Sequence, residues 1–195
     1  MIFFKRSKIK RLSKKIKALK LNRVHNQPST AALKKEAALY HQLAKIYRAL
    51  EGKKKYPFAH EMVVECYRSS AAIEDSEAQF ILAKYLLDAA KFRETLQLEG
   101  IFASELNEKV RDQHLAEALV FLKMAIDLNH IQAKRLYGLC YINGWGVPVD
   151  QDKGFEFVVS SIEQEGSWDK VPQIFAAIGL NKPEFYTALM KHRTK

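Results

Sequence analysis

The sequence predicts an all-α protein in which about three helix-turn-helix repeats follow a basic N-terminal helical arm. Only 8 Gly and 5 Pro occur among 195 residues, which is few for the many turns of a β-sandwich or barrel. One stretch of the chain also repeats itself with helical spacing. The positive charge is concentrated at one end, so residues 31–195 form a nearly neutral domain and residues 1–30 an arm with a linker.

The internal repeat is clearest in two segments that align without a gap, Tyr67–Phe80 and Leu122–Arg135. Each segment contains the end of one helix, a short polar turn and the start of the next helix. From these segments, pairs of helices are predicted in repeats at about 39–77, 78–132 and 133–168. In the first helix of each pair, large apolar residues recur at four and eight positions, which places them on one face of an α-helix.

The second repeat is longer than the third. Its anchor positions Ala78 and Ala118 are 40 residues apart, whereas Ala133 and Gly154 are 21 apart, a difference of 19 residues. The extra residues lie within 88–114. They predict either two long helices with a loose link or an elaboration that binds a partner, because insertions in repeat proteins project from one face. Residues 169–195 are expected to cap the last repeat.

The third repeat contains a set of residues with a familiar spacing: Ala133, Gly138, Tyr141, Gly144, Trp145, Gly146, Val147, Asp150 and Lys153. In these residues it resembles the Sel1-like repeat, a relative of the tetratricopeptide repeat. It departs from the family pattern at Gly154, where Ala is usual, and at Ser160 and Ser161, where two Ala are usual. The first two repeats match only in their helices. The resemblance implies a right-handed α-solenoid that scaffolds protein complexes, common in bacteria, and it implies no reaction.

The turn inside the third repeat can also be explained by its residues. Gly144 and Gly146 give the backbone freedom to reverse direction. Pro148 prevents the preceding helix from continuing, and Asp150 can cap the first N–H groups of the next helix. A lone Gly-x-Gly also occurs in phosphate-binding loops, but here no strand precedes it and the third glycine of a dinucleotide fingerprint is missing.

A partner-binding groove is predicted on the face of each first helix that is not used for packing. By helical spacing, its candidate residues are Gln42, Ile46, Ile81, Tyr85, Asp88, Leu136, Cys140 and Asn143. Most of them are apolar, which suits a hydrophobic peptide or helix. The alternative is that the face is set one position off, in which case some of these residues belong to the core.

The arm is strongly cationic. Residues 1–35 contain 12 Lys or Arg and no acid, whereas residues 36–195 contain 20 basic and 22 acidic residues, a net charge of −2. A helix over about 7–21 would have an apolar stripe flanked by cations. The predicted anchor residues are Lys5, Arg6, Lys8, Ile9, Lys10, Arg11, Leu12, Lys14, Lys15, Ile16, Lys17, Leu19, Lys20 and Arg23, of which Ile9, Leu12, Ile16 and Leu19 form the stripe.

Three partners suit such an arm, besides the alternative of a flexible solubilising tail. An anionic membrane surface or an acidic protein groove would use both the charge and the stripe. A nucleic acid would use the charge but has less use for the stripe. The absence of acidic residues in the arm also fits a mitochondrial presequence or a nuclear localisation stretch, and both are minor alternatives.

The expected function is that of a non-enzymatic adaptor or scaffold subunit that binds protein partners in a larger complex. The alternative is an RNA-associated structural subunit. No cofactor, metal or small-molecule substrate is expected, because the six histidines are scattered and no nucleotide or hydrolase motif occurs. Cys66 and Cys140 lie in apolar helical stretches, which favours a reducing compartment. The predicted location is therefore cytoplasmic, with peripheral attachment to the inner face of a membrane as an option.

Overall fold

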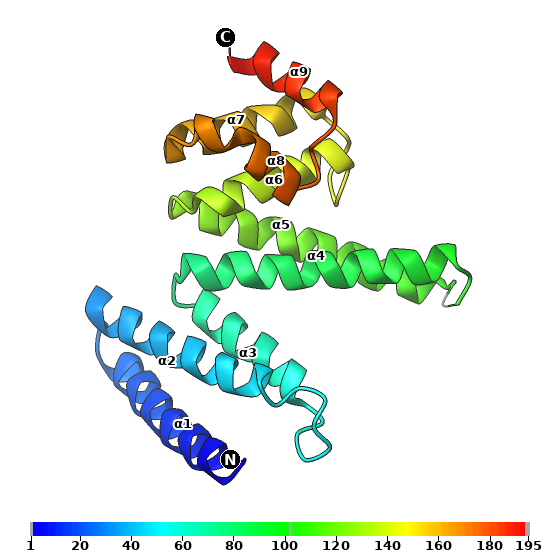
Figure 1. Cartoon of the computed structure of the whole chain (residues 1–195). Coiled ribbons are helices and arrows are strands. Elements are labelled where there is room, and N and C mark those ends of the chain that lie inside the picture. The colour runs from blue at the N-terminus through cyan, green and yellow to red at the C-terminus, as the bar shows by residue number, and fades with distance from the viewer. Residues whose placement is uncertain (1, 102, 194–195) are drawn as a thin grey trace. The chain divides into compact units, whose positions relative to one another are not determined.

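The computed structural model describes residues 2–101 and 103–193, and the side chains of residues 5–101 and 103–192. Every regular element in these residues is a helix (Figure 1), which confirms the predicted all-α class. The α-helices are α1 (Ile2–His25), α2 (Thr30–Arg48), α3 (Ala59–Ala71), α4 (Ser76–Leu98), α5 (Glu105–Asp127), α6 (Ile131–Asn143), α7 (Gln151–Glu165), α8 (Val171–Ala177) and α9 (Pro183–Arg193), and a short 3-10 helix, η1, spans Trp168–Lys170.

The chain divides into two compact units, residues 1–82 and 83–195, and the boundary falls inside α4. The predicted pairs of helices occur in the predicted order, as α2 with α3, α4 with α5, and α6 with α7. Within the first unit α2 packs against both α1 and α3, and within the second unit α6 packs against both α5 and α7. No helix in the described residues is long and apolar enough to cross a membrane.

The extra residues of the predicted second repeat lie in two long helices and the link between them. Helices α4 and α5 have 23 residues each, whereas α6 has 13 and α7 has 15. Ser104 starts α5, because its hydroxyl accepts a hydrogen bond from the Asn107 N–H at 3.2 Å. The structure therefore agrees with the prediction of two long helices.

The N-terminal arm is a helix that packs on its neighbour. The stripe residues Leu12 and Ile16 are only 2% and 6% exposed, while Ile9 and Leu19 are half-buried. A polar contact supports the packing near the N-terminal end of α1, where Lys5 Nζ donates a hydrogen bond to the Ala49 carbonyl at 3.2 Å. Leu12 and Ile16 are therefore buried within the first unit. The prediction that they contact a separate partner molecule is wrong.

One buried ion pair joins the two helices near the start of α2. The Glu36 side chain is buried, and its Oε1 accepts a hydrogen bond from Arg23 Nη2 at 3.4 Å. Its Oε2 lies 3.4 Å from Arg23 Nε, within ion-pair distance. Lys20 lies over the Tyr40 ring, with Nζ 5.5 Å from its centroid. The apolar seam and these pairs together explain why α1 stays alongside α2 despite its positive charge.

Two glycines allow α6 and α7 to approach closely. A Cβ added to Gly138 would lie 2.6 Å from the Gly154 carbonyl oxygen, and one added to Gly154 would lie 2.8 Å from the Gly138 oxygen. The predicted role of the small residue at position 138 is thus confirmed. Gly154 is the complementary residue on α7, and it stands where the resembling family usually has Ala.

The residues predicted to form a C-terminal cap pack against α7. Pro172 and Pro183 lie in the first turns of α8 and α9, where a missing N–H costs nothing. Phe175 and Leu189 are buried in one cluster with Phe155 of α7. This cluster covers the apolar side of α7, the last helix of the third repeat.

Shortening Leu12 should destabilise the protein. We expect Leu12→Ala to lower the free energy of unfolding by about 2 to 5 kcal/mol, because a buried leucine is lost and a cavity remains. Leu21 lies on the same helix but is 60% exposed, so Leu21→Ala should change it by less than about 0.5 kcal/mol. Urea unfolding followed by circular dichroism measures both. Equal effects would contradict the packing of α1 on α2.

Placing Ala at position 154 should also destabilise this chain. The new Cβ would meet Ile142 Cγ1 at 2.5 Å as well as the Gly138 oxygen. Overpacking costs about 1 to 3 kcal/mol, and the helix preference of Ala returns up to about 1 kcal/mol. We therefore expect Gly154→Ala to lower the melting temperature, while Glu156→Ala on the exposed side of α7 leaves it nearly unchanged. A stabilised Gly154→Ala protein would show that α6 and α7 are not in close contact.

Candidate functional site

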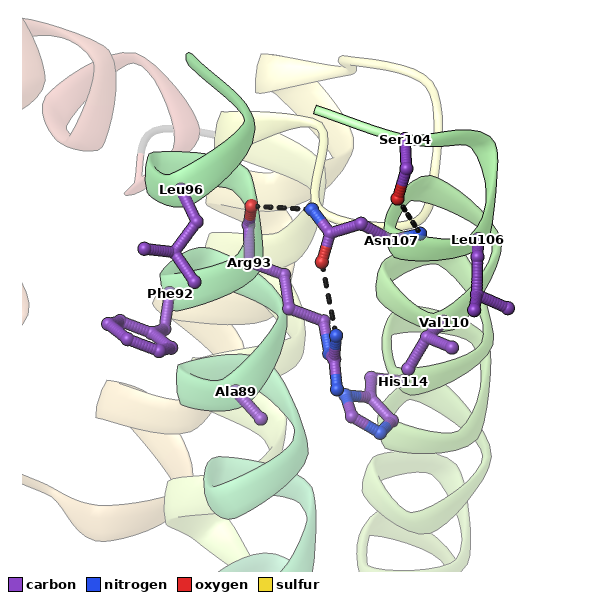
Figure 2. A pocket seen from close by; sticks show the side chains of 9 residues that line it. All are labelled: Ala89, Phe92, Arg93, Leu96, Ser104, Leu106, Asn107, Val110 and His114. Atoms are coloured by element: carbon purple, nitrogen blue, oxygen red, sulfur yellow. Dashed lines mark hydrogen bonds between the residues drawn. The ribbon is translucent and has the colours of Figure 1, made fainter. Parts of the chain in front are cut away.

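A pocket lies between α4 and α5 near the link that joins them, and we call it the hairpin pocket. It has a volume of about 490 Å³, and Figure 2 shows the side chains around it. Its lining residues are Ala89, Phe92, Arg93, Leu96, Ser104, Leu106, Asn107, Val110 and His114. All of them fall within residues 88–114. One of the two predictions for this segment was that it binds a partner.

Asn107 forms the polar centre of this pocket. Its side chain is only 6% exposed and bridges the two helices, since Oδ1 accepts from Arg93 Nη1 at 3.1 Å and Nδ2 donates to the Arg93 carbonyl at 3.0 Å (Figure 2). Nδ2 also lies 3.2 Å from Gln97 Oε1. These bonds hold the guanidinium of Arg93 in one position between α4 and α5.

Arg93 has a neutral hydrogen-bond partner in the described residues, the amide of Asn107. In the part of the chain that the structure describes, no carboxylate forms an ion pair with Arg93, and its side chain bonds to the neutral amide of Asn107. The carboxylate of Glu108, on the same hairpin, accepts instead from Gln97 Nε2 at 2.9 Å. A half-buried cation held by a neutral partner can accept an anionic group from outside.

The rim of the hairpin pocket is apolar and exposed. Phe92 is 63% exposed and Leu106 70% exposed. Leu98, the last residue of α4, and Ile101, in the link to α5, are also exposed. Single exposed apolar side chains are ordinary, but several on one hairpin next to a pocket indicate an interaction surface.

The structure separates the predicted groove residues into three groups. Ile46 and Cys140 are buried, so their prediction as groove residues is wrong. They are buried because α2 and α6 each lie between two neighbouring helices and use two faces for packing. Gln42, Asp88 and Asn143 are exposed, and Ile81, Tyr85 and Leu136 are half-buried.

Burial also raises the pKa of the Cys140 thiol to about 12, so this thiol stays protonated at neutral pH.

The predicted turn residues of the third repeat have the expected local roles. Gly144 ends α6 with φ of +74°, and Asp150 caps α7 by accepting from the Lys153 N–H at 3.0 Å. Gly146 packs against α5, because a Cβ there would lie 2.9 Å from Leu115 Cβ. Lys91 of α4 lies 3.4 Å from the centroid of the Trp145 ring. The turn is thus fixed to α4 and α5.

A second pocket, of about 380 Å³, lies in the first unit beside a cluster that the sequence did not single out. Asp75 Oδ2 is 2.6 Å from His41 Nε2 and accepts from Ser70 Oγ at 2.6 Å. These three residue types also form hydrolytic triads, but here the histidine and the serine both bond to the carboxylate. The geometry is therefore that of a clamp between α2, α3 and the start of α4.

This clamp shifts the pKa values of its two titratable groups. The hydrogen bond to Asp75 raises the pKa of His41, although burial opposes the shift. Burial alone would raise the pKa of Asp75, but the hydrogen bonds from His41 and Ser70 outweigh it and lower the pKa. Both shifts favour the charged pair in the folded protein.

Comparison with protein-family models finds no match, and comparison with curated protein sequences finds no match either. In the described residues, no group of three or more His, Cys, Asp or Glu side chains could hold a metal ion.

The His41–Asp75 pair should make stability depend on pH. The stabilisation from His41 is complete below its unfolded-state pKa of about 6.5 and is lost as pH rises through its raised folded-state pKa. The stabilisation from Asp75 is present above its unfolded-state pKa of about 3.9 and is lost as pH falls through its lowered folded-state pKa. We expect melting temperature to be highest between these limits. In His41→Gln the decline above pH 6.5 should be smaller, and an unchanged profile would contradict the clamp.

Proposed function

We propose that this protein is a non-enzymatic adaptor, a short helical-repeat scaffold that binds a partner protein at the hairpin pocket. The observation that carries the proposal is the exposed apolar rim around Arg93, a cation with no carboxylate partner among the described residues. The order of helix pairs and the residues of the third repeat that resemble the Sel1-like family support a scaffolding role. A cytoplasmic location, where the two buried thiols stay reduced, suits this role.

The length of α5 explains why this part of the scaffold is open to a partner. Helix α5 has 23 residues and its neighbour α6 has 13, so about ten residues, or about 15 Å of α5, extend past the length of α6. The hairpin pocket lies toward the N-terminal end of α5, between residues 104 and 114. A partner segment that packed there would contact side chains of α5 that lie beyond the length of α6.

The chemistry of the pocket defines the partner segment. It should present a large apolar side chain to Phe92 and Leu106, and a carboxylate beside it to Arg93. Burying such an apolar side chain contributes about 1.5 to 3 kcal/mol, and the charge-assisted hydrogen bond adds direction. Asn107 already holds the guanidinium in place, so little side-chain entropy is lost on binding.

Selection from a random peptide library tests this proposal. We expect peptides selected on the native protein to combine a large apolar residue with a neighbouring Asp or Glu. Peptides selected on Arg93→Gln should keep the apolar residue and lose the acidic preference. The double variant Phe92→Ser with Leu106→Ser should weaken binding of the native-selected peptides by at least about tenfold, which corresponds to about 1.4 kcal/mol.

A matched control separates the pocket from general surface hydrophobicity. Val120 and Val149 are also exposed apolar residues of the second unit and lie outside the hairpin pocket. The double variant Val120→Ser with Val149→Ser should bind the selected peptides as the native protein does. Selected peptides that bind all variants equally, or a library that yields no common pattern, would contradict the proposed site.

A further inference from the structure

A second surface, independent of the hairpin pocket, is formed by the cations of the first two helices. Residues 1–50 contain 14 Lys or Arg and one acid, Glu36, whereas residues 51–195 contain 18 basic and 21 acidic residues. Glu36 is buried and paired with Arg23, so its charge does not reach the surface of α1. The outer face of α1 therefore carries positive charge with no acidic residue among it.

The cations of α1 form two rows. Lys8, Arg11 and Lys15 follow each other at i, i+3 and i+7, and all three are exposed. A second exposed row at i, i+4 and i+7 consists of Lys10, Lys14 and Lys17. Because successive residues turn by about 100° in a helix, neighbours such as Lys10 and Arg11 place the rows on different sides of the outward face. We call these six residues the two cation rows.

The other residues of α1 determine what kind of polyanion fits. The side chains of Leu12 and Ile16 are buried against α2, so they cannot insert into a lipid bilayer. The exposed aliphatic residues Leu21 and Val24 lie only in the last turns of the helix. Residues 5–25, which include both cation rows, contain no Phe, Tyr or Trp, so single-stranded bases have no aromatic ring to stack on along the rows.

We infer that the outward face of α1 binds double-stranded DNA through its phosphates, without reading its sequence. The major groove of B-form DNA is about 12 Å wide and accepts an α-helix, while that of A-form RNA is too narrow. Each cation row covers about 10 Å of helix, and each DNA strand presents one phosphate per about 3.4 Å of axis. The two cation rows thus match about three phosphates on each strand.

Salt dependence and charge removal test the inference. The affinity of the full chain, freed of nucleic acid, is measured by fluorescence anisotropy with a labelled 20-base-pair DNA duplex from 50 to 200 mM KCl. Six phosphate contacts predict a slope of log affinity against log salt of about −5, which is about a thousandfold loss over this range. The variant K10Q/K14Q/K17Q should reduce the slope by about 2 to 3, since each lost contact removes about 0.9.

A control variant and three alternative ligands make the result specific. Lys109, Lys170 and Lys182 are exposed and lie in the second unit, so K109Q/K170Q/K182Q removes the same charge elsewhere. The control should bind DNA with the native slope. The inference is overturned if both triple variants lose the same slope, or if the native protein shows no duplex binding at 50 mM KCl. Tighter binding to single-stranded DNA, duplex RNA or phosphatidylserine vesicles than to duplex DNA would also overturn it.

Folding of the α1 variant is verified independently of binding. The three substituted lysines are exposed and make none of the contacts that join α1 to α2 through Leu12, Ile16 and Arg23. Its helical circular dichroism and melting temperature should therefore equal those of the native chain. Should this variant melt lower, the single variants K10Q, K14Q and K17Q are measured in its place, each with an expected slope change of about 0.9. Failure of this inference leaves the hairpin pocket untouched, because its residues lie in the other unit.

Discussion

The packing of helices side by side requires each inner helix to bury two faces and each outer helix only one. Helix α2 contacts both α1 and α3, and α6 contacts both α5 and α7. The inner helices therefore have little apolar surface left for a partner, which is why Ile46 and Cys140 are buried. Within the first unit α1 packs against α2 and leaves its other side to solvent. That side can carry a density of positive charge that no inner position would tolerate.

The sequence predicts the all-α class and several helix starts because the deciding signals are local. The helix starts at Ser29, Ser104 and Asp150 follow from side-chain oxygens that cap nearby N–H groups. The turn at residues 144–150 follows from its glycines. Apolar spacing also predicts the stripe of α1, but it cannot tell whether another helix of the same chain or a separate molecule covers that stripe. This choice depends on the tertiary neighbour α2, about which the local pattern says nothing.

The candidate site was predictable only as a segment. The extra length of the second repeat marks residues 88–114, and the structure places the hairpin pocket there. Its chemistry was missed, since Arg93 and Asn107 are 14 residues apart and come together only when α4 and α5 are antiparallel neighbours. The same holds for His41 and Asp75, which are 34 residues apart. A cation and a neutral amide have no spacing that distinguishes them from ordinary surface residues.

The burial of the apolar stripe of α1 changes which ligands its positive charge can bind. An exposed stripe flanked by lysines is typical of a helix that lies in a membrane surface, where apolar burial and charge act together. Because α2 covers Leu12 and Ile16, burial of these side chains stabilises the fold and cannot add to binding of a partner. Only the positive charge of α1 is left to attract one. A surface that attracts by charge alone selects ligands by the density and spacing of their anions. The regular phosphates of a double helix meet that condition more closely than mobile lipid headgroups, because their positions are fixed before binding.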